Sequence, residues 1–104
     1  MPKTIRPFDP VASAIELHAM LAVAIRNKGW ELDMVLHGTS GVISVFGQQQ
    51  WQGRGAAICD IHPTQHRHWY VEWIDGKMMN GNGGNYAFVK VLTDGIEANM
   101  KWVV

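Results

Sequence analysis

The sequence is short of the features that mark several large classes of protein. Its 104 residues include a single cysteine, so no disulfide can form within the chain. No apolar run approaches the ~20 residues that a membrane-spanning helix needs. The first ten residues, MPKTIRPFDP, lack the apolar stretch of a secretory signal. We therefore expect a cytoplasmic protein without a membrane segment.

An excess of charge of either sign is also missing. Nine Lys and Arg residues balance nine Asp and Glu residues, and the basic ones are scattered singly from Lys3 to Lys101. Non-specific binding of nucleic acid depends on clustered Lys and Arg that neutralise phosphates. The scattered charges therefore predict no nucleic-acid partner.

Apolar residues, in contrast, are plentiful. They make up 47% of the chain, enough for burial of a core to offset the loss of chain entropy. A chain of this length builds one core. We therefore expect a single domain that spans residues 1–104.

Residues 10–28 carry the signals of a helix. Asp9 is placed to be the N-cap, Pro10 suits the first helical position, and Gly29 suits a left-handed C-cap. One face of the projected helix should pack on a sheet; it holds Val11, Ala14, Ile15, His18, Leu21, Ala22 and Ile25. The other side is apolar too, with Ala12, Ala19, Met20 and Val23. Such a helix usually contacts a second surface, and we expect a twin subunit.

After Gly29 the apolar period becomes that of a strand. Strands are expected at residues 30–37, 42–46, 56–62, 69–75, 86–92 and 96–104, with turns at 38–41, 63–65 and 93–95 and loops at 47–55 and 76–85. Since no helix separates them, the strands should be antiparallel. The sequence thus predicts an α+β fold in which one N-terminal helix packs on a strongly twisted antiparallel sheet of about six strands. The alternative is a small, partly closed β-barrel with the helix against it.

Histidines gather around the turn between the third and fourth expected strands. The spacing His66-x-His68 directs two imidazoles to one side of an extended segment, and His62 and Glu72 are close enough in sequence to join them. A divalent transition metal is the candidate cofactor. The alternative is a solvated turn whose histidines bind nothing.

The run His66-x-His68-x-x-x-Glu72 resembles the first metal-binding motif of the cupin family. That resemblance would imply a metal held by histidines and a glutamate inside a barrel. It covers seven residues and does not assign the chain to that family.

Two further side chains stand where a core is expected. Cys59 lies in an apolar strand beside Ile58, so packing is expected in place of thiol chemistry. His18 falls on the helix face that should be buried. It is either a satisfied core histidine or part of the lining of a ligand cavity between helix and sheet.

Five tryptophans and six methionines exceed what one small core can fully bury. Both residue types suit apolar ligands and partner surfaces. The candidate ligand-binding residues are Trp51 in a polar loop, Trp69 and Trp73 on one strand face, and His18. We predict a binding module and not an enzyme, a homodimer that holds a small apolar or aromatic ligand or docks a protein partner. A metal-dependent enzyme that uses the histidine cluster and an inhibitor or immunity-type protein are the two alternatives.

Overall fold

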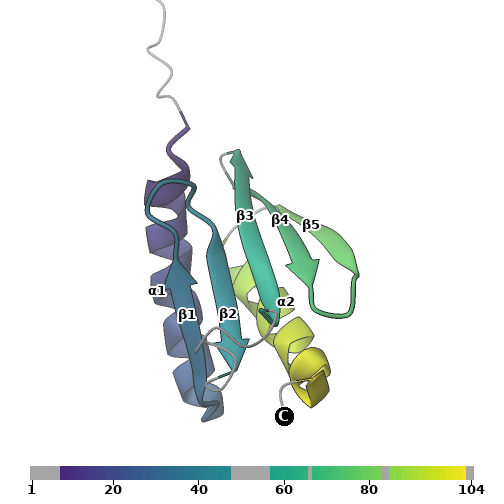
Figure 1. Cartoon of the computed structure of the whole chain (residues 1–104). Coiled ribbons are helices and arrows are strands. Elements are labelled where there is room, and N and C mark those ends of the chain that lie inside the picture. Colours follow the sequence, from purple (N-terminus) through teal and green to yellow (C-terminus); the bar gives the residue numbers. More distant parts are fainter. Residues whose placement is uncertain (1–7, 48–56, 66, 83–84, 103–104) are drawn as a thin grey trace, which may run out of the picture.

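The computed structural model of this protein describes residues 8–47, 57–65, 67–82 and 85–102. Five strands form one antiparallel sheet in the order β1-β2-β3-β4-β5, and two helices cover one of its faces (Figure 1). In chain order the elements are α1 (Pro10–Lys28), β1 (Leu32–Leu36), β2 (Ile43–Gly47), β3 (Cys59–Gln65), β4 (His68–Trp73), β5 (Met78–Asn82), α2 (Asn85–Asn99) and the 3-10 helix η1 (Met100–Trp102). The predicted α+β fold is confirmed, and the described strands form an open sheet.

Helix α1 begins and ends where its capping residues predict. The Asp9 carboxylate accepts hydrogen bonds from the backbone N–H groups of Val11 and Ala12 at 3.0 and 3.1 Å. At the other end, Gly29 takes the left-handed conformation with φ 74°, which glycine adopts without a steric penalty. Both boundaries are therefore determined by local chemistry.

The buried face of α1 is rotated from the predicted one. Ala14, Leu17, Leu21 and Ile25 are buried, whereas Ile15 is 55% exposed and His18 is half-buried. Leu17, absent from the predicted face, contributes to the core. Because α1 is apolar around most of its circumference, sequence periodicity could not decide which stripe faces the sheet.

Strand β3 extends further than the sequence predicts. Pro63 lies inside the strand opposite Trp69, and the turn falls after Gln65, where Arg67 has φ 61°. Strand β2 pairs only with residues 59–61 of β3, so Pro63 stands beyond that ladder, next to a shift in register with β4. Proline is tolerated at such irregular positions because no ladder hydrogen bond is lost. The predicted turn at residues 63–65 is therefore wrong.

The last third of the chain differs most from the prediction. Residues 78–82, expected to be a loop, form the edge strand β5. Strands were expected at 86–92 and 96–104, but the described residues 85–102 form α2 and η1 instead. Phe88, Leu92, Ile96 and Asn99 are buried at the spacing of a helix. Two polar side chains bond back to the backbone of the same helix: Thr93 Oγ1 donates to the Lys90 carbonyl at 3.0 Å and Asn99 Nδ2 to the Gly95 carbonyl at 2.8 Å.

Two glycines let α2 approach the sheet closely. A methyl group on Gly95 of α2 would overlap the indole of Trp73, and one on Gly81 of β5 would overlap the ring of Phe88. Trp69 stacks on Phe88 with ring centroids 5.8 Å apart. The core thus lies between the sheet and the two helices, with aromatic rings of β4 pressed against α2.

No helix in the described part of the chain has the length and apolar character that crossing a lipid bilayer requires.

Candidate functional site

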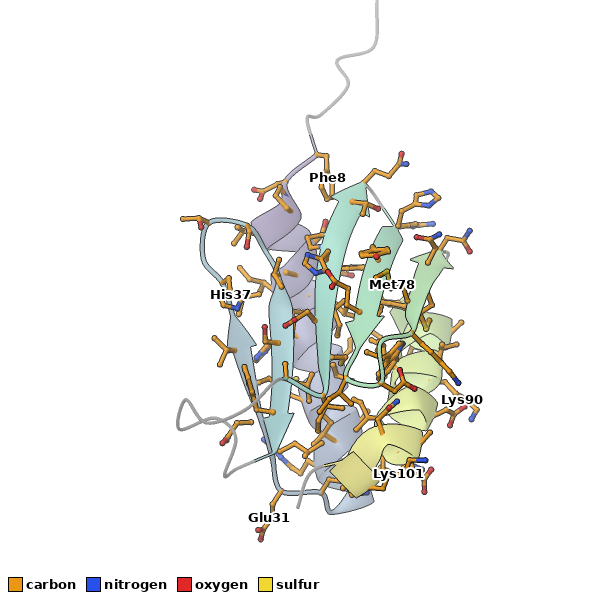
Figure 2. The ribbon with its side chains drawn as sticks, turned by 45° about the vertical axis from the view of Figure 1, so that its right-hand side comes forward. Phe8, Glu31, His37, Met78, Lys90 and Lys101 are labelled. Carbon is orange, nitrogen blue, oxygen red and sulfur yellow. The ribbon has the colours of Figure 1, made fainter. Side chains whose placement is uncertain are left out.

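Two surfaces of the molecule that differ in character are exposed to solvent. One is the sheet face that the helices leave uncovered, which we call the open sheet face. The other is the side of α1 and α2 directed away from the sheet, which we call the outer helix face. Figure 2 shows the open sheet face toward the viewer, with α1 behind it and Lys90 of α2 directed away from it.

The strand register aligns a row of residues across the open sheet face. Ser44 of β2 lies opposite Asp60 of β3, which in turn lies opposite Glu72 of β4, and Met78 of β5 ends the row. Directly paired residues of antiparallel strands point to the same face. Side chains from four strands therefore meet on this surface.

His37, Ser44 and Asp60 form a hydrogen-bonded chain. Oγ of Ser44, a residue only 4% exposed, donates to Oδ1 of Asp60 at 2.6 Å and lies 3.1 Å from Nε2 of His37. Because the hydroxyl proton is directed to Asp60, Oγ is left to accept from Nε2–H. A nucleophilic triad needs the histidine between the serine and the carboxylate. These three residues are arranged in a different order, which fits a structural role.

Further along the row, His62 meets Glu72. Nε2 of His62 lies 3.0 Å from Oε1 of Glu72, and the imidazole tilts against the ring of Tyr70 at a centroid distance of 5.8 Å. The Tyr70 hydroxyl donates to the sulfur of Met78. The polar groups of this surface thus contact one another.

The predicted metal ligands are only partly brought together. His62 and Glu72 are neighbours on the open sheet face, His68 is exposed at the first residue of β4, and His66 lies outside the described residues. Among the described residues, no three His, Cys, Asp or Glu side chains are grouped so that they could hold a metal ion. With His66 untested, the metal site stays a prediction.

The predicted ligand-binding residues occupy three kinds of position. Trp69 is 2% exposed and Trp73 is also buried, so both belong to the core. His18 is half-buried on α1. Trp51 lies outside the described residues.

Cys59 lies in the core, as its apolar sequence neighbours predict. Burial raises the pKa of its thiol, and the adjacent Asp60 carboxylate raises it further. The thiol stays protonated and is enclosed by side chains, which makes it a poor nucleophile.

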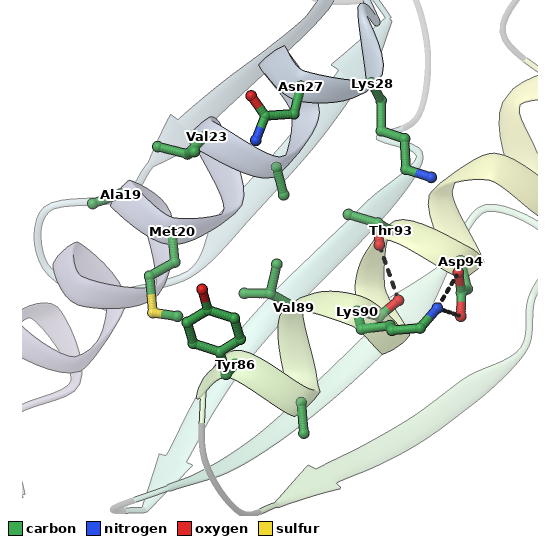
Figure 3. Close-up of a pocket in the computed structure, with 12 residues that line it drawn as sticks. Ala19, Met20, Val23, Asn27, Lys28, Tyr86, Val89, Lys90, Thr93 and Asp94 are labelled. Atoms are coloured by element: carbon green, nitrogen blue, oxygen red, sulfur yellow. Dashed lines mark hydrogen bonds and ion pairs between the residues drawn. The ribbon is translucent and has the colours of Figure 1, made fainter.

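The outer helix face carries an apolar groove. Its volume is about 850 Å³, and it lies between α1 and α2 on the side away from the sheet (Figure 3). The α1 wall consists of Ala19, Met20, Val23, Ala24, Asn27 and Lys28, and the α2 wall of Tyr86, Ala87, Val89, Lys90, Thr93 and Asp94. An ion pair between Lys90 and Asp94 at 3.3 Å borders one end.

Part of the apolar lining of this groove is open to solvent. Val23 is 54% exposed and Tyr86 is 87% exposed, and Met20 lies next to Tyr86 at the other end (Figure 3). Contiguous exposed apolar surface on a soluble domain usually marks an interaction site.

No protein-family model matches this chain, and no curated protein or solved structure is significantly similar to it.

The sequence identifies one wall of the groove but not the other. Met20 and Val23 are among the residues it places on the apolar side of α1 that faces away from the sheet. The α2 wall was missed because residues 86–92 were expected to form a strand. Tyr86, Val89 and Lys90 follow one another at helical spacing, and this spacing is the signal that could have identified the wall.

Proposed function

We propose that this protein is a non-enzymatic interaction module and that it binds an apolar surface of a protein in the groove of its outer helix face. The observation that carries the proposal is that Met20, Val23, Tyr86 and Val89 form a continuous apolar groove left uncovered by the rest of the described chain. Covering it would remove apolar area from water, at about 25 cal/mol for each Å².

The exposure of the groove favours a protein surface over a small ligand. Sites for small molecules usually bury about 70–90% of the ligand and are concave enough to enclose it. Here the lining residues Val23 and Tyr86 remain more than half exposed. A groove between two helices is instead suited to the side chains of another helix.

The contrast with the open sheet face supports a binding role without catalysis. The proton of Ser44 is directed to Asp60, and the Cys59 thiol is buried and protonated. Neither side chain is available as an activated nucleophile.

Fluorescence of anilinonaphthalene sulfonate, a dye that brightens in apolar sites, tests the groove in dilute protein. We expect the wild-type chain to bind the dye and Val23→Asp to bind it at least about tenfold more weakly, because the carboxylate must stay hydrated. The matched control is Ile15→Asp, since Ile15 is a β-branched residue of the same helix with nearly the same exposure, 55% against 54%, and it does not line the groove.

The control should bind the dye as the wild type does. Equal dye binding by wild type and Val23→Asp, with both chains folded by circular dichroism, would count against the groove as the binding surface.

A further inference from the structure

We infer that the occupant of the groove is a second copy of this chain, docked with its α1 antiparallel to the first α1 across a two-fold axis. This inference rests on the function proposed above and names the partner. It is argued from the order of the residues along the outer side of α1.

Glu16, Met20, Val23 and Asn27 follow one another along this side at spacings of four, three and four residues. This alternation keeps side chains on one stripe of a helix and is the spacing by which helices pack side by side. Figure 3 shows Met20, Val23 and Asn27 in succession along α1. The stripe is thus suited to contact another helix along its length.

The stripe is complementary to itself when its direction is reversed. An antiparallel copy centred between Leu21 and Ala22 places Met20 against Val23 of the other copy, and Ala19 against Ala24. Apolar side chains of similar size then meet in the middle, and small residues permit close approach of the helices. Self-complementarity of this kind is what a two-fold contact between identical chains requires.

Charge agrees with the same arrangement. The reversed copy sets Glu16 beside Asn27, which stands between the cations Arg26 and Lys28 in the last turn of α1. Glu16 and Arg26 are exposed, and neither has an ion pair with any described residue of its own chain. Across the two-fold axis each carboxylate meets a basic helix end, and the contact occurs twice.

The α2 wall completes the contact. Val89 and Tyr86 flank α1 along the groove, so Met20 and Val23 of the second copy enter between the two helices. The result is a layer of four helices between two sheets, with both open sheet faces left in solvent.

Sedimentation velocity of the full chain tests the partner, over roughly 1 to 100 µM, the range of a weak dimer. We expect the wild type to dimerise and Val23→Asp to raise the dissociation constant at least about a hundredfold, because two carboxylates would be buried in the apolar centre. Ile15→Asp should not weaken the dimer. A wild type that stays monomeric throughout this range overturns the inference, as does a Val23→Asp chain that still dimerises.

Charge substitutions test the antiparallel order. Glu16→Lys should raise the dissociation constant about three- to tenfold and Asn27→Asp by about threefold, since each brings like charges together across the axis. The double variant should dimerise more tightly than Glu16→Lys alone. Within one chain the two positions are about 16 Å apart along the helix, so such recovery can arise only between copies.

A double variant no tighter than Glu16→Lys overturns the antiparallel arrangement. These outcomes are separate from the dye experiment, which uses dilute monomer. Loss of dye binding in Val23→Asp together with a monomeric wild type would retain the groove and reject the second copy, whereas unchanged dye binding would reject the groove itself.

Discussion

The open sheet face and the outer helix face both meet solvent, but they do so by different means. On the sheet, Ser44 donates a hydrogen bond to Asp60, and Nε2 of His62 lies 3.0 Å from Oε1 of Glu72, so these polar side chains contact one another. On the helices, Met20 and Val23 form an apolar stripe that no other part of the described chain covers. The two exposed surfaces therefore differ. Polar side chains of the open sheet face contact one another, whereas the apolar stripe of the outer helix face is the surface for which we propose a partner.

Two adjacent residues of α1 test this difference most strongly. Leu21 is fully buried against the sheet, and Met20 lines the groove. We expect Leu21→Ala to lower the free energy of unfolding by about 2–5 kcal/mol, because it leaves a cavity. Met20→Ala should lower it by less than about 1 kcal/mol when measured on dilute monomer. Urea denaturation gives both values, and equal losses would mean that Met20 belongs to the core.

The polar row of the sheet gives the next largest effect. Asp60→Ala leaves the buried hydroxyl of Ser44 without its acceptor, so the free energy of unfolding should fall by about 1–3 kcal/mol. Replacing Ser44 by alanine as well should recover part of that loss. Chemical denaturation of the two variants measures the recovery, and sedimentation should find the dissociation constant unchanged. Weakened dimerisation in Asp60→Ala would contradict the separation of the two faces.

Cys59 gives a pH-dependent test of the covered sheet face. Its pKa in the folded chain is raised by burial above the ordinary value of 9.0, and the Asp60 carboxylate adds to the rise. The unfolded thiol ionises near that ordinary value while the folded one keeps its proton. The contribution of the protonated thiol to the free energy of unfolding is therefore fully present below about pH 9. It is lost as the pH rises further, by up to about 1.4 kcal/mol per pH unit.

The control for this prediction is Cys59→Ala. It has no thiol, so its unfolding free energy should fall less steeply between pH 9 and 10.5, a window of about 1.5 units above the ordinary thiol pKa. Denaturation curves across that window compare the two slopes. Identical slopes would show that the thiol ionises equally in both states.

The smallest effect should come from the exposed end of the polar row. The side chains of His62 and Glu72 are 34% and 47% exposed, so solvent screens their contact. We expect Glu72→Gln to change the free energy of unfolding by no more than about 1 kcal/mol at neutral pH. Thermal melting at low and high salt measures it, and the difference from wild type should shrink as salt is added. A larger loss would mean that this part of the row supports the fold.

The sequence predicts α1 well because its ends depend on neighbouring residues. Asp9 and Gly29 act within a few positions of themselves, so their roles can be read locally. Local signals mislead for α2, because the segment Thr93-Asp94-Gly95 is typical of a turn. In the folded chain Trp73, which is distant in sequence, packs where Gly95 has no side chain, and such a contact cannot be read from neighbouring residues.

The functional surfaces divide in the same way. Met20 and Val23 are identified as apolar residues on the far side of α1 from their helical positions alone. The contact of Ser44 with Asp60 depends on the pairing of β2 with β3, and residue spacing does not specify which residues of two separated strands lie opposite each other. The α2 wall of the groove is not predicted, because the sequence assigns the residues of α2 to strands.

The glycine contacts have a mechanical consequence for the groove. If α2 slid along the sheet by about one turn, Leu92 or Asn99 would stand over the indole of Trp73, where only Gly95 leaves room. Helix α2 therefore fits at one position on the sheet, and this position fixes its distance from α1. The width of the groove is therefore set before a partner binds, so little binding free energy would be spent on rearranging the two helices.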